Sequence, residues 1–132
     1  MRTPLCIKAV LIGFVGITLA SAQGGTDTSP SYDVKSEVVV NGKVAAVAVM
    51  PDWMGKNGVN VTLQTPESVM IHVDTAPADF LKMLDFAIAA GDNLDVEGVW
   101  SQWDGKRVFL ARTVTRQKIA VCLRGPDGKV VW

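Results

Sequence analysis

The sequence has few of the side chains that usually carry metal or redox chemistry. Its 132 residues include one histidine and two cysteines, which lie far apart in the sequence, so there is no ligand cluster of the zinc type. Charge of one sign is also missing, because 13 Lys and Arg residues balance 13 Asp and Glu residues. Such a chain has no bulk attraction for a polyanion, and we expect no nucleic-acid partner. The length allows one domain, which excludes a multidomain enzyme.

Long hydrophobic runs are absent as well. The apolar run at 9–20 is about a dozen residues long, whereas a membrane-spanning helix needs about 20. Arg2 and Lys8 flank the preceding stretch, and Ala20-Ser21-Ala22 forms a small-x-small cleavage site. These features are typical of a secretory signal peptide. We therefore predict a signal peptide over 1–22 and an exported protein, periplasmic or extracellular, with no stable membrane span after cleavage.

The stretch at 23–33 is rich in Gly, Ser, Thr and Pro and has no apolar period. This composition predicts a flexible leader. A form cleaved after Ala22 keeps one cysteine, Cys122, so no disulfide can form within that form and its stability must come from a hydrophobic core.

Short Val-rich runs bounded by turn residues dominate the rest of the chain and predict strands. The five strands are expected at 37–50, 58–64, 68–73, 93–103 and 107–117. Helical spacing at 75–86 predicts one short helix between the third and fourth strands. Gly42 and Gly98 lie inside strands, which favours bulges or sharp bends there. The tail at 118–132 holds two apolar pieces around Gly125-Pro126-Asp127-Gly128, a pattern typical of a hairpin.

This order of elements, with a long first strand bent at Gly42 and a Gly91-Asp92 entry into the fourth strand, resembles the OB-fold. The closing stretch at 123–132 is similar to the ending of small exported bacterial proteins of that type. The resemblance implies a mainly β protein, with an OB-fold-like five-stranded barrel over 34–117 and a C-terminal β-hairpin over 118–132. It implies no particular activity.

Alternation along the second and third strands separates two faces. Val59, Val61, Leu63, Val69, Ile71 and Val73 are expected in the core, which leaves Asn60, Thr62, Met70 and His72 on the outer face. OB-folds bind ligands on this face and at two neighbouring loops. Here those loops contain Trp53, Met54, Trp103, Lys106 and Arg107.

Two interpretations of this surface do not involve a metal. In the first, Trp53 and Trp103 are stacking platforms for an unknown small molecule or an envelope protein, since aromatic anchors dominate many interfaces. The polar contacts would then come from Asn60, Thr62, Lys106 and Arg107. The protein would be a non-enzymatic binding or accessory module of the cell envelope, without a cofactor. In the second, the tryptophans are lids over the barrel ends and the charged residues form a solvated turn.

The alternative is a soft-metal site. Met54, Met70 and His72 supply thioether and imidazole groups, which select Cu(I) or Ag(I) over hard cations. These residue types, with Trp53, are similar to those of periplasmic OB-barrel copper chaperones, which implies copper as the ligand. The closely packed Trp and Met motif of those chaperones is not reproduced at its spacing.

An enzymatic interpretation finds little support. Ser68 and His72 have the letters of a triad with Asp74, but residues four apart on a strand are about 13 Å apart, beyond hydrogen-bond reach. Asp95 and Glu97 are about 7 Å apart on one strand face, a spacing that a solvated face also produces. We expect no enzyme. A structural subunit that makes its contacts through a strand edge or the tail hairpin is a further alternative.

Overall fold

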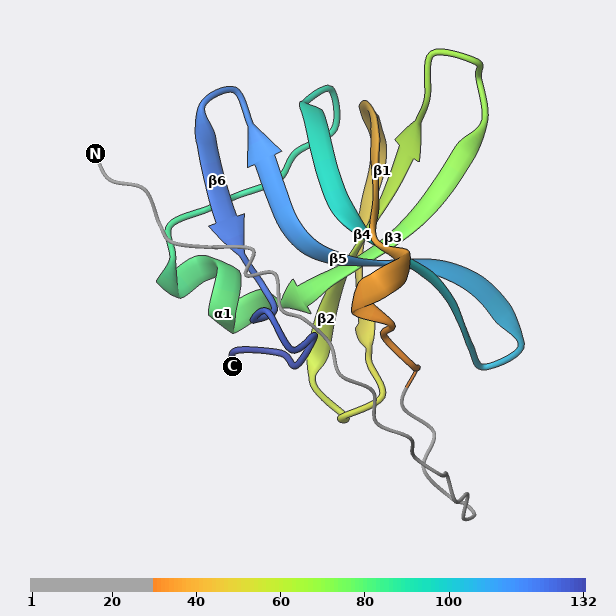
Figure 1. The fold of residues 1–132 in the computed structure, drawn as a ribbon. Coiled ribbons are helices and arrows are strands. Elements are labelled where there is room, and N and C mark those ends of the chain that lie inside the picture. The colour runs from red at the N-terminus through yellow and green to blue at the C-terminus, as the bar shows by residue number, and fades with distance from the viewer. Residues whose placement is uncertain (1–29) are drawn as a thin grey trace.

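The computed structural model describes residues 30–132. A short 3-10 turn, η1, precedes six strands and one helix (Figure 1). Their bounds are η1 Val34–Ser36, β1 Val38–Pro51, β2 Asn57–Gln64, β3 Met70–Pro77, α1 Ala78–Met83, β4 Asn93–Trp103, β5 Lys106–Arg116 and β6 Ile119–Cys122. The predicted signal peptide at 1–22 lies outside the described residues. No helix among residues 30–132 is long and apolar enough to span a bilayer.

The six strands form one sheet in the order β3-β2-β1-β4-β5-β6. A parallel pairing between β3 and β5 joins the first five strands into a ring. The other pairings are antiparallel. The predicted fold class is confirmed: the protein is mainly β, with one short helix between the third and fourth strands and a C-terminal hairpin. The OB-fold resemblance itself stays a prediction.

Strand β1 is long enough to pair with two neighbours in turn. Its first part, 38–43, pairs with β4, and its second part, 43–51, pairs with β2. A bulge between Val44 and Ala46 lies close to Gly42. Gly98 lies at a second register shift, where any Cβ would collide with the backbone carbonyl of Leu110 in β5. Gly42 therefore lies near a bulge, and Gly98 lies at a register shift where two strands approach closely. The sequence predicts irregularities of this kind at both glycines.

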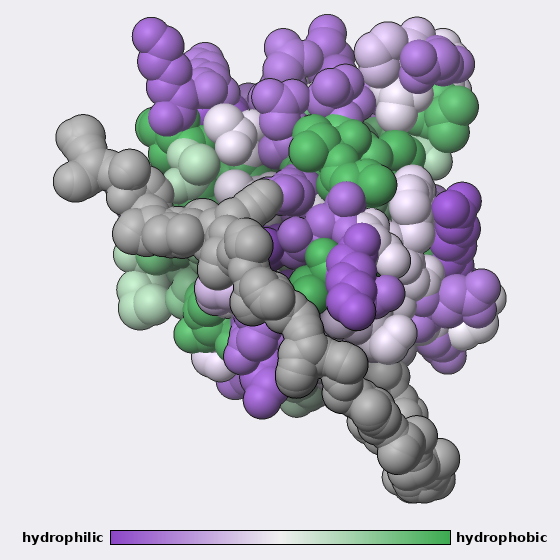
Figure 2. All heavy atoms as spheres, in the orientation of Figure 1, coloured by the Kyte–Doolittle hydropathy of each residue, from purple (hydrophilic) through white to green (hydrophobic). Residues whose placement is uncertain are grey.

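The core lies inside the ring. Val61, Leu63, Val73 and Phe109 are buried there, on the strand faces that the alternation assigns to the interior. Val69 is different, because β3 begins only at Met70 and Val69 lies exposed in the preceding loop. On the face shown in Figure 2, hydrophilic side chains separate several smaller hydrophobic patches.

Helix α1 is shorter than the sequence pattern suggested. Residues 75–77 continue β3, where the hydroxyl of Thr75 donates a hydrogen bond of 2.7 Å to the Val59 carbonyl. Pro77 occupies the N-cap position, and the helix ends before Asp85, whose φ is 58°. Leu81 is the buried residue of this helix, and the partly buried Ala78 and Phe80 also pack against the core.

The tail extends the sheet before it turns. β6 pairs with β5, and a turn at 125–128 then brings Val130 back to bridge Arg124. The Leu123 amide donates to the Arg112 carbonyl at 2.6 Å, which fixes the start of the turn on β5. Cys122 is half-buried and is disulfide-bonded in the full chain. The sequence excludes a disulfide only within a form cleaved after Ala22, which keeps one cysteine.

The described start of the chain packs against this tail. Ser101 in β4 donates a hydrogen bond to the Ser31 carbonyl at 2.9 Å, and Tyr32 is half-buried. A Cβ on Gly128 would approach the Tyr32 ring to 2.9 Å, so the turn and the ring are in close contact. The ordered fold thus begins before residue 34, inside the segment predicted to be a flexible leader.

Candidate functional site

The loop between β1 and β2 is built around Asp52. One carboxylate oxygen of this buried residue accepts hydrogen bonds from the amides of Met54 and Lys56, each at 2.9 Å. The Asp52 amide also donates to the Lys56 carbonyl. An aspartate that binds amides two and four residues ahead fixes a tight loop. Trp53 and Met54 are therefore held at the tip of a rigid loop.

Arg124 lies between two aromatic rings at this end of the molecule. Its guanidinium carbon is 4.6 Å from the centre of the Tyr32 ring and 5.8 Å from that of Trp53. The side chain also donates a hydrogen bond of 2.6 Å to the Gly128 carbonyl. Cation–π contacts of this kind are stronger when the cation is desolvated, and Arg124 is buried. Three segments, the start of the chain, the β1–β2 loop and the tail, meet at this one side chain.

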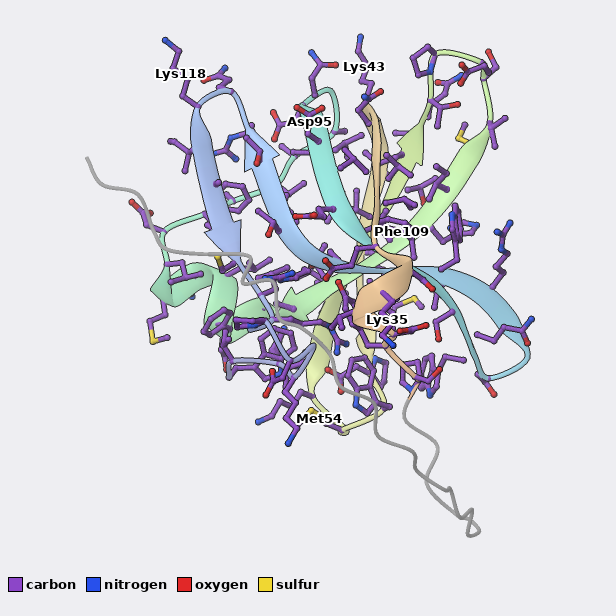
Figure 3. The ribbon with its side chains drawn as sticks, in the orientation of Figure 1. Lys35, Lys43, Met54, Asp95, Phe109 and Lys118 are labelled. Atoms are coloured by element: carbon purple, nitrogen blue, oxygen red, sulfur yellow. The ribbon has the colours of Figure 1, made fainter. Side chains whose placement is uncertain are left out.

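An open hollow of about 650 Å³ lies beside this arrangement. Its lining combines aromatic rings, a thioether and charges of both signs: Pro30, Tyr32, Trp53, Met54, Arg124, Asp127, Gly128, Lys129 and Val130. We call it the Trp53 hollow. Met54 is exposed at the bottom of the molecule as drawn in Figure 3. Cavities with apolar walls and a few polar groups are the usual form of a binding site.

The charges beside the hollow are not fully compensated. Burial and, to a smaller extent, the nearby charge of Asp52 raise the pKa of Asp74 to about 6, and Arg124 opposes the shift. Burial likewise lowers the pKa of Arg124. The carboxylates of Asp52 and Asp74 thus lie near a single guanidinium, that of Arg124. One positive charge does not offset both, so the ionised form of Asp74 is disfavoured.

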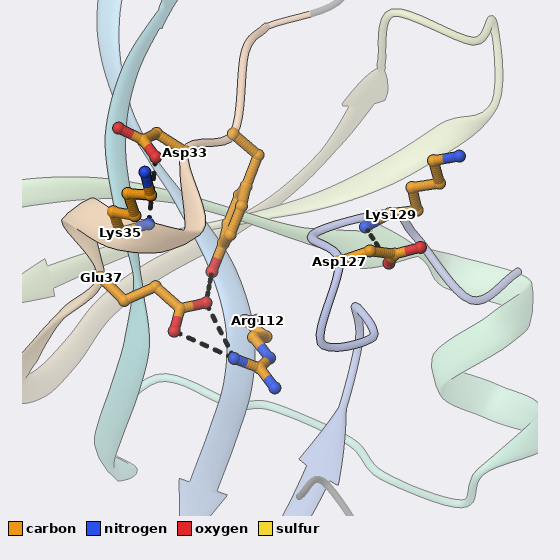
Figure 4. Close-up of polar contacts among 7 residues, drawn as sticks. Asp33, Lys35, Glu37, Arg112, Asp127 and Lys129 are labelled. Atoms are coloured by element: carbon orange, nitrogen blue, oxygen red, sulfur yellow. Dashed lines mark hydrogen bonds and ion pairs between the residues drawn. The ribbon is translucent and has the colours of Figure 1, made fainter. Parts of the chain in front are cut away.

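An ion pair between Glu37 and Arg112 fixes Tyr32. The Tyr32 hydroxyl donates to Glu37 at 2.7 Å, and Arg112 donates to both oxygens of Glu37 at 2.9 and 3.0 Å (Figure 4). Burial and the neighbouring Glu37 carboxylate raise the pKa of Tyr32 above its ordinary range. The phenol therefore stays protonated and keeps its ring in place against Arg124.

The second group of predicted ligand-binding residues lies elsewhere. Trp103 and Lys106 pair across the turn that joins β4 to β5. Arg107 stacks on Trp100, with its guanidinium carbon 3.9 Å from the ring centre. This hairpin points to the lower right of Figure 1, whereas the β1–β2 loop points to the bottom. None of these three residues lines the Trp53 hollow, so the two predicted tryptophan platforms are not parts of one hollow.

The outer face of β2 and β3 is arranged as the alternation predicts. Asn60 pairs with Asp74, and Thr62 pairs with His72. The Thr62 hydroxyl lies 3.4 Å from Nδ1 of His72. His72 and Met70 are exposed on this face.

The three soft-ligand candidates do not converge. Met70 pairs with Gln64, which pairs in turn with Lys43 at the top of Figure 3, whereas Met54 is at the bottom. The two ends of β2 are separated by six strand residues, so the distance between them is about 20 Å. Met54 therefore cannot share an ion with Met70 and His72. Residues 30–132 contain no group of three or more His, Cys, Asp or Glu side chains arranged to hold a metal.

The sequence patterns did not single out Tyr32, Asp52 or Arg124. Tyr32 is the only tyrosine of the chain and stands in a segment otherwise poor in apolar side chains, which is the one local sign of an anchored residue. Arg124 directly precedes the predicted turn of the tail. Nothing local indicates that these two residues meet, because the contact joins opposite ends of the described chain.

Comparison with known families adds a classification. The model of the MamS/MamX magnetosome protein family matches residues 36–121, which is more than half of the chain. The chain belongs to this bacterial family. No curated protein matches it. The MamS/MamX match covers the five-stranded ring and Trp53 but ends before Arg124 and begins after Tyr32. Arg124, which contacts Trp53, and Tyr32, which contacts Arg124, thus lie outside the matched region.

Proposed function

We propose that this protein is an exported accessory module of the bacterial cell envelope, which binds a partner protein at the Trp53 hollow and catalyses no reaction. Membership of the MamS/MamX family supports an accessory role close to magnetosomes. The N-terminal pattern at 1–22 supports export.

One observation carries the proposal: Trp53 is fixed before any partner arrives. Asp52 holds the loop, and Arg124 stacks between Trp53 and Tyr32. A fixed aromatic side chain binds with little loss of conformational freedom, so more of its contact energy appears as affinity. Trp and Arg are also the residue types most enriched in interface hot spots. An apolar side chain of the partner would contact Trp53 and Met54, with Lys129 and Asp127 at the rim.

The test is site-specific photo-crosslinking in the envelope fraction. A benzophenone side chain placed at Met54 should yield a discrete crosslinked species, and the same group at Val69, exposed in the β2–β3 loop, should not. The crosslink should disappear when Trp53→Ala is added and persist when Trp103→Ala is added. A crosslink unaffected by Trp53→Ala, or one equally strong from position 69, contradicts the proposal.

A further inference from the structure

Among residues 30–132, no strand pairs with one edge of the second half of β1. Residues 43–51 pair with β2 on one side, and pairing with β4 is confined to 38–43. Residues 91 and 92 close the opposite edge only as far as Val44. Within the described part of the chain, the stretch at 45–51 therefore presents a strand edge without a pairing partner. It contains no charged residue and only one proline, Pro51, although natural proteins usually protect such edges with charge, proline or a covering element.

The hydrogen-bond pattern identifies the backbone groups on this edge. The Val44 amide and carbonyl bond to residues 92 and 91, away from β2. After the bulge at 44 to 46, the Asp52 amide bonds to Lys56 on the β2 side. Because the direction alternates along a strand, even-numbered residues from 46 to 52 face β2. The amides and carbonyls of Val47 and Val49 therefore point toward the open edge.

The side chains of the same two residues are also uncovered. Val47 and Val49 pair with the buried Val61 and Val59, so they lie on the inner face of the sheet. They are nevertheless 37% and 57% exposed. An apolar groove of about 280 Å³ continues from Val47. Its lining includes the buried Leu81 and Phe86, with Lys82 and Asp85 also lining it.

We propose that this edge is the contact surface for a second copy of the chain, with the two β1 strands paired antiparallel about Ala48. In that register Val47 of each copy faces Val49 of the other, and their outward amides and carbonyls form mutual hydrogen bonds. The apolar side chains of these pairs lie on one face. Such a two-fold contact requires a self-complementary surface, and this segment supplies one.

The charges around the groove favour the same occupant. Lys82 and Asp85 are both exposed at its rim. Each copy thus presents one positive and one negative group, so a two-fold arrangement does not force like charges together. An added strand from another protein would use the same edge, and the experiment below distinguishes that case, because the isolated chain would then remain monomeric.

The experiment measures molar mass by light scattering at micromolar to millimolar concentrations of the protein. The wild-type protein should reach the mass of a dimer. Val49→Lys should remain at the monomer mass, because each copy would then place a charged lysine against Val47 of the other on the apolar face of the contact. Val69→Lys introduces the same charge at a comparably exposed valine and should still dimerise. Circular dichroism should be the same for all three. A monomeric wild type, or a dimer insensitive to Val49→Lys, overturns the proposal.

A second variant tests the register directly. Directly opposed residues of a non-hydrogen-bonded antiparallel pair have Cα atoms about 4.5 Å apart, within the range that a disulfide bridges. Ala48→Cys should therefore form an intermolecular disulfide in air, seen as a dimer on a non-reducing gel. Val69→Cys is the matched control and should form much less. Equal crosslinking at both positions, or none at position 48, contradicts the β1 pairing even where a dimer exists.

Discussion

Glu37 and Arg112 form an ion pair across 75 positions of sequence, in which one nitrogen of Arg112, Nη1, donates to both carboxylate oxygens, and the two side chains are only 11% and 4% exposed. Glu37 directly precedes β1, and Arg112 belongs to β5. The pair therefore fixes the start of the chain to the far side of the sheet. Nε of Arg112 is buried without a hydrogen-bond partner, so Glu37 provides most of the compensation for this charge.

Replacing Glu37 with alanine should lower the free energy of unfolding by about 3 kcal/mol, because an unpaired buried charge is costly. Urea unfolding at neutral pH measures the change. Asp95→Ala removes an exposed carboxylate and should alter stability by less than about 0.5 kcal/mol. Equal effects of the two substitutions would show that the pair contributes little.

The pKa of Asp74 predicts an unusual dependence of stability on pH. It is about 6 in the folded protein against an ordinary value of 3.8, so between these values the folded state binds the proton more tightly than the unfolded chain does. This contribution to stability is present below about pH 4 and is lost as the pH rises through about 6.

Asp74→Asn should remove this dependence. At neutral pH the variant should be more stable than the wild type by about 1 to 3 kcal/mol, and the gain should vanish in acid. Urea unfolding at a series of pH values follows both curves, with the exposed Asp79→Asn as control. A gain of the same size at every pH would exclude titration of Asp74 as its cause.

Gly98→Ala should be among the most damaging small substitutions in the chain. The new methyl group would collide with the Leu110 carbonyl, and backbone cannot move aside as a flexible side chain can. We expect a loss of about 3 kcal/mol or more, measured as a lower thermal midpoint. Gly125→Ala is a suitable comparison, because its nearest neighbour is the Asp127 side chain at 3.4 Å. A well-tolerated Gly98→Ala would contradict this packing.

The soft-metal alternative is open to a direct test. Met70 and His72 share one exposed face, but Met54 lies about 20 Å away along the hairpin. Two soft ligands without a third should bind Ag(I) weakly, so we expect titration calorimetry to detect no tight site. Tight binding that is lost in the double variant Met70→Ala, His72→Ala and kept in Met54→Ala would instead establish a site on the β3 face.

Much of the fold follows from local sequence patterns. Alternating valines locate the strands, and Gly98 marks the place where β4 shifts register. Alternation along β2 and β3 also places Thr62 and His72 on one face, because only local backbone geometry is needed for that. The sequence places the boundary between β3 and α1 less accurately. Thr75 lies in the strand, where its hydroxyl donates a hydrogen bond to Val59, and the helix begins only after Pro77.

The candidate site was only partly predictable, because long-range packing determines it. Trp53 was expected at a binding surface, and its loop position made that inference possible. Arg124, which contacts Trp53, and Tyr32, which contacts Arg124, lie near opposite ends of the described chain, and no periodicity connects them. The distance between Met54 and Met70 depends on strand direction, which residue types alone do not reveal.

The contact between Tyr32 and the turn at Gly128 has a consequence for biosynthesis. A nascent chain that has not yet reached residue 128 lacks the surface on which Tyr32 packs, and it lacks Arg124 to stack against Trp53. The ring of strands can form earlier, but the Trp53 hollow is completed only when residues 124–130 are free to fold onto it. Binding competence should therefore appear last, after the rest of the molecule has folded.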